Sequence, residues 1–292
     1  MTFWLTQLSL MGVYVTLVSS YDLIAGRAGL MSLSHAALFG VGAYTTALVM
    51  LHSPVHDALL LIPMSAVIAA VLSLPVAALS LRIRRDHFAV TSLGFALAFI
   101  AVLNNVRPLG LAEGLIGIPT MTVAGLSLFD PAAVTVFALV VAAVVVGVVI
   151  VLVRGSWGLR LAAVRDSERA AVSFGINPVT TRTSAVVVSG AGAGIAGSVY
   201  VAYALFVSPE TFDLSTLALI VAMLGLGQTM GLAGYVIGPA VLVGASAALE
   251  YLHVVSLTVL GQLDQIAYGL VMVLAIRLVP RRRRRAIAEG RR

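Results

Sequence analysis

Nine apolar runs divide this 292-residue chain, and most of them approach the length that an α-helix needs to cross a bilayer. Charged residues make up only 10% of the chain, whereas a soluble domain carries about 25%. The pattern predicts an all-α, polytopic integral membrane bundle of about nine spans, within a range of eight to ten because Pro and Gly interrupt several runs. The runs lie at 3–19, 36–51, 58–81, 88–104, 132–153, 182–206, 214–227, 235–255 and 262–279.

These runs predict one membrane domain over residues 1–280, with a charged loop at 154–181 and a basic tail at 281–292. No basic segment and no small-residue cleavage motif accompany the first run, so we expect a span there and not a cleaved signal. Arginines that follow a span commonly rest at anionic lipid headgroups. We therefore expect the tail to contact membrane lipid and not nucleic acid.

All 18 basic residues are arginine, and this has two consequences. A phosphate-binding loop of the G-x-x-x-x-G-K-S/T type needs a lysine, so ATP that drives this protein must be hydrolysed by another chain. In a nine-span arrangement, successive connections between runs lie on alternate sides of the membrane. In that arrangement 17 of the 18 arginines fall on one side, and Arg107 is the exception. The positive-inside rule makes that side the cytoplasm. We expect a bacterial cytoplasmic (inner) membrane protein with its N-terminus outside and its C-terminus inside.

Signals for enzymatic chemistry are weak. The five histidines lack metal-ligand spacing such as H-E-x-x-H, the chain has no G-x-S-x-G motif, and it has no cysteine. Charged residues gather at span ends and in loops, which disfavours a carrier that moves protons along buried carboxylates. We expect no catalytic residue, no metal site and no cofactor bound by this chain.

The stretch Tyr21–Val49 interrupts its apolar run with Gly26, Arg27 and Gly29. An interrupted helix at membrane depth is tolerated where protein or a cavity covers it, although an ordinary tight connection between two spans is the alternative. Ser32 or Ser34 can provide the N-cap of the next helix. The candidates for a pathway or a broken helix are Gly26, Gly29, Ser32, Ser34, His35 and, in a later glycine-rich stretch, Gly227.

The segment "GSWGLRLAAVRDSERAAVSFGINP", residues 155–178, is charged and helical in character. Ser156 is expected to cap a short helix that ends near Val164, and Asp166 a second helix with Glu168 in its first turn. Gly175 is placed for a left-handed stop before Asn-Pro. The segment is either an amphipathic loop on lipid headgroups or a docking element for a soluble partner, with an apolar set of Leu161, Val164, Ala170, Ala171 and Phe174.

"GLRLAAVRDSERAAVSFGIN" resembles the cytoplasmic signature loop in permeases of branched-chain amino acid (Liv-type) ABC importers, and the chain is closest to their M-type. Here Leu159 follows Gly158, where the family usually has arginine. "YDLIAGRAGLMSLSHAALFGVGAYTTAL" also resembles the family, with Asp22 and Ser34 as departures. The resemblance covers about residues 15–280. It implies an ATPase-docking (coupling-helix) loop that includes Gly158, Arg160, Leu161, Val164, Arg165, Asp166, Glu168, Ala171 and Gly175.

The resemblance also implies partners. These are a second permease of the H-type, two ABC ATPase subunits that bind ATP and Mg²⁺, and an extracytoplasmic solute-binding protein. The expected solutes are branched-chain or related hydrophobic amino acids. The alternatives are an ABC permease for urea, short amides or another small solute, then a stand-alone secondary transporter, and then a membrane enzyme or scaffold.

Overall fold

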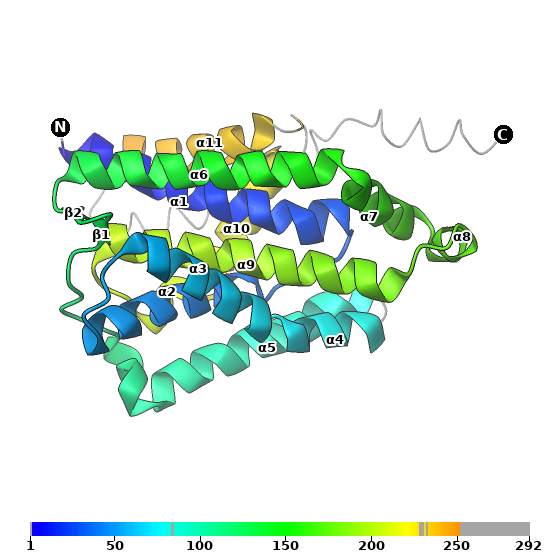
Figure 1. The fold of residues 1–292 in the computed structure, drawn as a ribbon, viewed down its shortest axis with the longest axis horizontal. Helices are drawn as coiled ribbons and strands as arrows, with labels where there is room; N and C mark the ends of the chain where they lie inside the picture. Colours follow the sequence, from blue (N-terminus) through cyan, green and yellow to red (C-terminus); the bar gives the residue numbers. More distant parts are fainter. Residues whose placement is uncertain (1, 83–84, 228–230, 232, 252–292) are drawn as a thin grey trace. The chain divides into compact units, whose positions relative to one another are not determined.

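Helices make up nearly all the regular structure of the computed structural model, which describes residues 2–82, 85–227, 231 and 233–251 (Figure 1). The first half contains α1 (Thr2–Asp22), the π-helix η1 (Leu23–Arg27), α2 (His35–His52), α3 (Ala58–Leu72), α4 (Leu74–Arg82) and α5 (Arg85–Asn105). The second half contains α6 (Pro131–Arg154), α7 (Ser156–Asp166), α8 (Glu168–Ser173), α9 (Pro178–Ala204), α10 (Leu214–Gly227) and α11 (Gly234–Tyr251).

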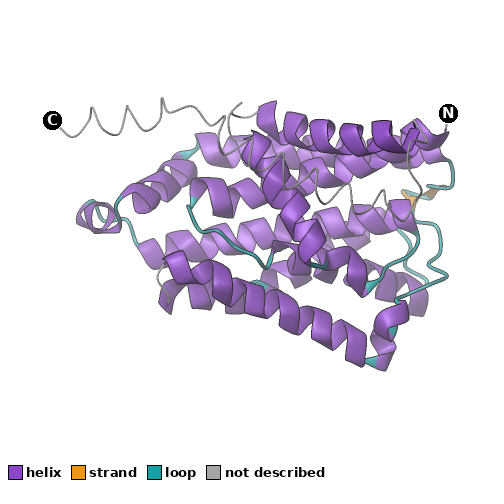
Figure 2. Cartoon of the chain, turned by 180° about the vertical axis from the view of Figure 1, so that it is seen from behind, coloured by secondary structure: helices purple, strands orange, loops and turns teal. Residues whose placement is uncertain are grey.

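The connections contain three short 3₁₀ turns and one small hairpin. The turns are η2 (Arg107–Leu109), η3 (Leu111–Glu113) and η4 (Pro209–Phe212). Strands β1 (Thr122–Val123) and β2 (Leu126–Ser127) pair antiparallel, with Thr122 opposite Ser127. Figure 2 shows that this hairpin lies in the loops at the end of the bundle where α1 begins.

Seven helices within the described residues are long and apolar enough to span a membrane, and they match the first seven apolar runs of the sequence. This confirms the predicted all-α polytopic membrane bundle. The eighth run corresponds to α11, where the apolar helix found, Gly234–Ala248, is shorter. The ninth run, 262–279, and the tail 281–292 lie outside the described residues. The spans are Phe3–Arg27, His35–His52, Ala58–Leu81, His87–Asn105, Pro131–Arg154, Pro178–Ala204 and Pro209–Gly227.

The third span is broken at Ser73 into α3 and α4. Pro75 explains the break, because proline has no N–H for the helical ladder and its ring crowds the carbonyl four residues earlier. Ser73 donates its hydroxyl to the Ala70 carbonyl at 2.6 Å, and its N–H bonds the Ala69 carbonyl. Local side-chain and backbone bonds of this kind satisfy polar groups that lipid could not.

Residues 1–217 form one compact unit and residues 218–292 a second. The predicted single domain over residues 1–280 stays a prediction. In the first unit, α9 is the central helix and packs against α1, α2 and α3 (Figure 1). The glycine-rich stretch 189–198 belongs to this helix and is largely buried. α9 therefore holds the first unit together.

Glycines of α9 allow neighbouring backbones to approach closely. A Cβ added to Gly194 would lie 2.5 Å from the Ser65 carbonyl oxygen and 2.6 Å from the Ala69 Cβ of α3. A Cβ added to Gly42 of α2 would meet the Gly194 backbone. Membrane helices associate through such close packing, because moving apolar side chains from lipid into a helix interface provides no hydrophobic driving force. The abundance of small residues thus has a packing explanation at α9.

α6 shows the opposite pattern, because the valines along one of its faces are exposed. It packs against α1 on its other face, where Thr135 Oγ1 and Ser9 Oγ lie 2.9 Å apart in the interior. Valines spaced mostly four apart occupy a single helical face, and lipid can solvate them without cost. The exposed residues of this face are Val136, Val140, Val144, Val148 and Val151.

These packing differences predict opposite effects for one substitution at two helical glycines. Gly194→Ala is expected to cost about 1–3 kcal/mol, because the new methyl group overpacks α9 against α3. Gly147→Ala is the matched control: nothing lies within 4 Å of a Cβ added there, so alanine should stabilise α6 by up to about 1 kcal/mol. Thermal unfolding of the purified protein in detergent measures both. Equal midpoints for the two variants would contradict the packing assignment.

Candidate functional site

Two short helices, α7 and α8, leave the bundle at the end opposite to the start of α1 (Figure 1). We call residues 156–175 the knob. α7 packs closely on the end of α6: a Cβ added to Gly158 would run into the backbone of Val153. Leu161 and Val164 of α7 and Ala171 of α8 are buried. The predicted pair of short helices is therefore confirmed, and its apolar side chains attach it to the bundle.

Hydrogen bonds at the end of α8 fix the direction in which the chain returns. Gly175 has a φ of +77°, a conformation that glycine adopts without steric cost. The N–H of Ile176 bonds the Ala171 carbonyl at 3.0 Å and that of Gly175 the Val172 carbonyl at 2.9 Å, which is a Schellman motif. Asn177 then caps α9 by accepting from the Val179 N–H at 2.9 Å. The predicted left-handed stop at Gly175 is confirmed.

Both predicted N-caps of the knob are wrong by one residue. Gly155 is the N-cap of α7, and Ser156 is already its first residue. α7 also runs past Val164 to Asp166, so Ser167 and not Asp166 caps α8, accepting from the Ala170 N–H at 3.3 Å. The reason is conformational: a cap needs non-helical dihedral angles. Ser167 has them (φ −155°, ψ 109°), whereas Asp166 remains in the helix.

Side-chain bonds tie the knob to α9. Arg182 Nη2 of α9 donates to Glu168 Oε2 at 2.6 Å, and the arginine side chain is only 11% exposed. Trp157 Nε1 of α7 donates to Ser184 Oγ of α9 at 2.9 Å. The bond between a buried guanidinium and a carboxylate is charge-assisted and therefore among the stronger kinds. Glu168, predicted to dock on a partner, thus also holds α8 against α9.

The knob presents three large exposed apolar side chains: Leu159, Val172 and Phe174, which are 70%, 55% and 84% exposed. The apolar set predicted from the sequence included Phe174 and the exposed Ala170 but missed Val172, and it treated Leu159 only as a departure from the family. Of the predicted docking residues, Gly158, Leu161, Val164 and Ala171 are buried, Arg165 is partly exposed, and Arg160, Asp166, Glu168 and Gly175 are exposed.

Arg165 connects the knob to the interrupted helix predicted around Gly26. Its Nη1 donates to the Gly26 carbonyl at 2.7 Å. α1 continues there as the π-helix η1, and Gly29 follows with a φ of +67°. We call residues 23–34 the interrupted segment. The segment connects two candidate spans, Phe3–Arg27 and His35–His52, and lies beside the knob. A role of Gly26 and Gly29 in a pathway or a broken helix stays a prediction.

A buried polar cluster follows the interrupted segment. His35 Nε2 lies 3.3 Å from Ser20 Oγ and 3.2 Å from the Leu17 carbonyl oxygen, within hydrogen-bonding distance of both. Ser34 occupies the N-cap position of α2, but its hydroxyl lies 2.9 Å from Ser32 Oγ and makes no capping bond. Tyr21 donates its hydroxyl to the Ser32 carbonyl at 2.9 Å. The structure brings Ser32, Ser34 and His35 together, and their role in a pathway stays a prediction.

Gly227, the remaining pathway candidate, belongs to the second unit and is the last residue of α10. A Cβ added to Gly227 would meet the backbone of Gly234, the first residue of α11. Close packing of these two helix ends therefore accounts for glycine at this position. Residues 228–230 after it lie outside the described residues, and the role of Gly227 in a pathway or a broken helix stays a prediction.

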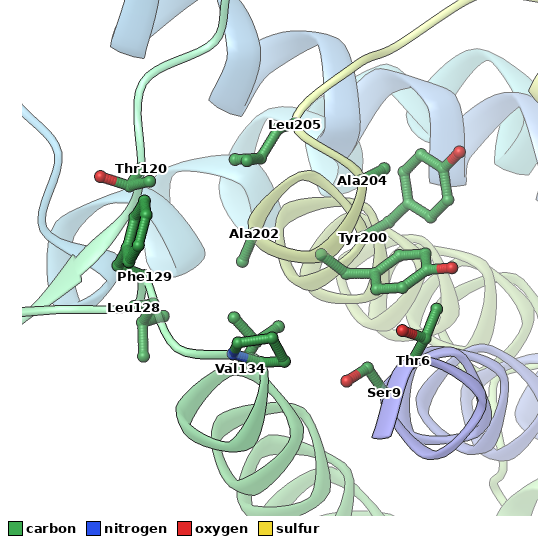
Figure 3. A pocket seen from close by; sticks show the side chains of 12 residues that line it. Thr6, Ser9, Thr120, Leu128, Phe129, Val134, Tyr200, Ala202, Ala204 and Leu205 are labelled. Carbon is green, nitrogen blue, oxygen red and sulfur yellow. The ribbon is translucent and has the colours of Figure 1, made fainter. Parts of the chain in front are cut away.

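A cavity of about 510 Å³ lies at the end of the first unit away from the knob, between α1, α6, α9 and the loop before α6 (Figure 3). Among the described residues that line it, none is charged. Such a lining can hold the apolar part of a small solute, but it offers no opposite charge to a carboxylate or an ammonium group. The polar and aromatic members of the lining are Thr6, Ser9, Thr120, Phe129, Tyr200 and Tyr203.

No group of three or more His, Asp or Glu side chains that could hold a metal ion occurs in the part of the chain that the structure describes. The site that the structure describes is a partly apolar knob that is bonded to the interrupted segment and to α9.

Residues 3–276 match the family described as the permease component of branched-chain amino acid transport systems. The high-affinity branched-chain amino acid transport system permease protein LivM of Salmonella typhimurium (strain LT2) is 30% identical over 261 residues, which cover 81% of this chain and 61% of the relative. The protein of the same name from Escherichia coli (strain K12) is 29% identical over 239 residues, which cover 74% of this chain and 56% of the relative.

No solved structure matches the chain. The chain spans 61% and 56% of the length of the two curated relatives. Both relatives bear the LivM name, consistent with the predicted M-type, and the family match covers nearly the whole bundle. The predicted resemblance is confirmed: this integral membrane protein belongs to the family of permease components of branched-chain amino acid transport systems.

Proposed function

We propose that the chain is a permease subunit of an ATP-driven importer that moves branched-chain or related hydrophobic amino acids across the membrane. The observation that carries this proposal is the knob, because a capped pair of helices with an exposed aromatic tip suits insertion into a groove of a soluble protein. Exposed apolar patches of this kind mark interaction sites. The membership of the chain in the permease family supplies the class of solute.

Several chains carry out different steps of transport. This chain catalyses nothing: it contains no lysine for a phosphate-binding loop, so two ABC ATPase subunits bind ATP and Mg²⁺ and hydrolyse the nucleotide. A second permease of the H-type completes the membrane path, and an extracytoplasmic binding protein delivers the solute. The chain itself binds no cofactor, metal or nucleic acid, and lipid surrounds its spans.

The docking contact itself rests on Phe174 and Val172, which are exposed on and just after α8. Burial of an aromatic anchor in a partner's pocket is a common source of binding energy. Four features hold this anchor in place: the cap at Ser167, the Schellman motif at Gly175, the Asn177 cap and the Glu168–Arg182 ion pair. A preordered anchor loses less conformational entropy when it binds.

We further propose that the knob lies on the cytoplasmic side of the bacterial inner membrane, with the N-terminus outside and the C-terminus inside. The arginine distribution of the sequence supports this orientation. In this arrangement the β1–β2 hairpin and the cavity of Figure 3 lie at the extracytoplasmic end of the first unit, where a binding protein would deliver solute.

Phe174→Asp is expected to prevent the ATPase from co-purifying with the gently solubilised protein, because a charge at the anchor cannot be desolvated cheaply. The control is Leu126→Asp in β2, which alters an exposed apolar side chain (76% exposed) at the other end of the bundle. This control should retain the ATPase. Retention of the ATPase by both variants, with normal ATP-driven uptake, would refute docking at Phe174.

The absence of cysteine allows a direct test of orientation by single-cysteine labelling. Ser127→Cys in β2 and Ser173→Cys in α8 both replace exposed serines. A maleimide that cannot cross membranes is expected to label position 127 in intact cells and position 173 only after the cells are opened. Labelling with the reverse pattern would overturn the orientation.

Uptake by the whole assembly, reconstituted in vesicles with its ATPases and binding protein, tests the solute class. We expect ATP-dependent accumulation of radiolabelled leucine, with no requirement for a proton gradient. ATP-dependent uptake of urea with no uptake of leucine would show the alternative solute class of the same superfamily. Uptake that needs a proton gradient and proceeds without ATPases would instead show a secondary transporter.

A further inference from the structure

We infer that Arg165 is a positioning residue that transmits movement of the knob to the interrupted segment, residues 23–34. The inference rests on the proposed function, since it assumes that an ATPase moves the knob, and it deepens that function by naming the link between knob and bundle. The family resemblance grouped Arg165 with the residues that dock on the ATPase. The structure instead places its guanidinium against the bundle.

The contact between Arg165 and the interrupted segment involves both the head and the stem of the side chain. Nη1 donates to the Gly26 carbonyl at 2.7 Å. A Cβ added to Gly29 would lie 2.6 Å from Arg165 Cγ, so the absence of a side chain at Gly29 makes room for the arginine. A cation also suits this position, because the last turn of a helix presents carbonyl groups of partial negative charge. The side chain of Arg165 is 33% exposed, which leaves this contact partly shielded from water.

Other arginines of the knob lack this geometry. Arg160 lies on the exposed face of α7, and its Nε donates to the carbonyl of Ser156 in its own helix at 3.4 Å. Arg169 is exposed on α8. Asp166 Oδ1 lies 3.3 Å from Arg165 Nε, and the Asp22–Arg27 ion pair, whose atoms lie 2.9 Å apart, flanks Gly26 in the sequence. Arg154, the last residue of α6, is exposed and lies outside the knob, so it serves as the control for Arg165.

The backbone of the interrupted segment departs from a regular α-helix. A π-helix such as η1 departs from the regular ladder, and such departures are frequent at functional sites. Gly29 follows with a positive φ, and residues at the ends of elements absorb the dihedral changes of hinge motions. The contact with Arg165 is thus made at a point where the backbone is not locked by continuous α-helix.

The far end of the interrupted segment is bonded to three spans. Tyr21 of α1 donates to the Ser32 carbonyl at 2.9 Å, and the Leu33 N–H bonds Ser92 Oγ of α5 at 2.8 Å. Ser34 leads directly into α2, where His35 faces Ser20 and the Leu17 carbonyl of α1. A displacement at Gly26 is therefore passed to α1, α2 and α5 through direct contacts. The chain of contacts runs from knob to Arg165, then to the interrupted segment and the spans.

Two variants disturb the proposed link from its two sides. Arg165→Ala removes the donor, and Gly29→Ala places a methyl group against the arginine stem from a residue outside the knob. In reconstituted complexes, Arg165→Ala should keep its ATPases and their ATP hydrolysis but lose about tenfold in solute moved per ATP, as expected for loss of a hydrogen bond to a charged group. Arg154→Ala should keep the ratio of the unmodified protein. Arg165→Met, which keeps an unbranched stem but removes the N–H donors, replaces Arg165→Ala if the alanine variant does not insert.

A reporter on the interrupted segment gives a readout that a purely structural role would not change. Met31 is 46% exposed, and the chain has no cysteine, so Met31→Cys can carry a single spin label. The spectrum should change when ATP and vanadate trap the ATPases. Arg165→Ala should abolish that change, and Arg154→Ala should preserve it.

The outcomes separate this inference from the proposed function. In the double variant Arg165→Ala with Gly29→Ala, the losses in solute moved per ATP should not add, because both changes disturb the same contact between Arg165 and the interrupted segment. Additive losses of solute moved per ATP in the double variant would overturn the inference. A normal ratio of solute to ATP in Arg165→Ala, together with a normal spectral change, would also overturn it. In both cases the importer assignment stands. Loss of ATPase co-purification in Arg165→Ala, but not in Gly29→Ala, would place Arg165 in the docking contact and overturn the inference as well. An unmodified protein that binds no ATPase overturns both.

Discussion

The close approach of α9 to α2 and α3 is the contact on which the first unit depends. Glycine at 194 lets α9 lie against the Ser65 carbonyl and the Ala69 methyl group, and Gly42 lets α2 lie against the backbone of Gly194. Membrane helices gain little from burying apolar side chains against each other, so intimate backbone packing and interhelical hydrogen bonds must supply the association. The Thr46–Ser65 hydroxyl contact of 2.7 Å between α2 and α3 belongs to the same layer.

From this fixed centre, α9 continues out of the packed region and holds the knob. Arg182 and Ser184 bond Glu168 and Trp157 from the first turns of α9, a few residues before the glycine-rich stretch. The same helix therefore anchors the bundle and orients the element proposed to meet the ATPase. Arg165 adds a second attachment, to the interrupted segment, so the knob contacts the bundle through one rigid helix and one segment with an irregular backbone.

Several features of the site could be read from the sequence, and others could not. The stop at Gly175 was predictable, because only glycine adopts a φ of +77° without steric cost. The caps at Gly155 and Ser167 were missed by one residue, because glycine, serine and aspartate are all accepted at an N-cap. The choice between them depends on where the backbone leaves helical geometry. The break at Ser73 lies beside Pro75, which the sequence already marked as a helix interruption.

The sequence by itself determined the first seven spans, the charged loop and the family, since these depend on local composition and short motifs. Only the tertiary structure decided that Arg165 meets Gly26, which is 139 positions away in the chain. It also decided that Glu168 pairs with Arg182 and that His35 faces Ser20. These contacts could not be read from local patterns, because a long polar side chain at a helix end can reach solvent, lipid headgroups or a distant backbone. For Arg165, the packing of α7 against the end of α6 decides which of these partners the side chain reaches.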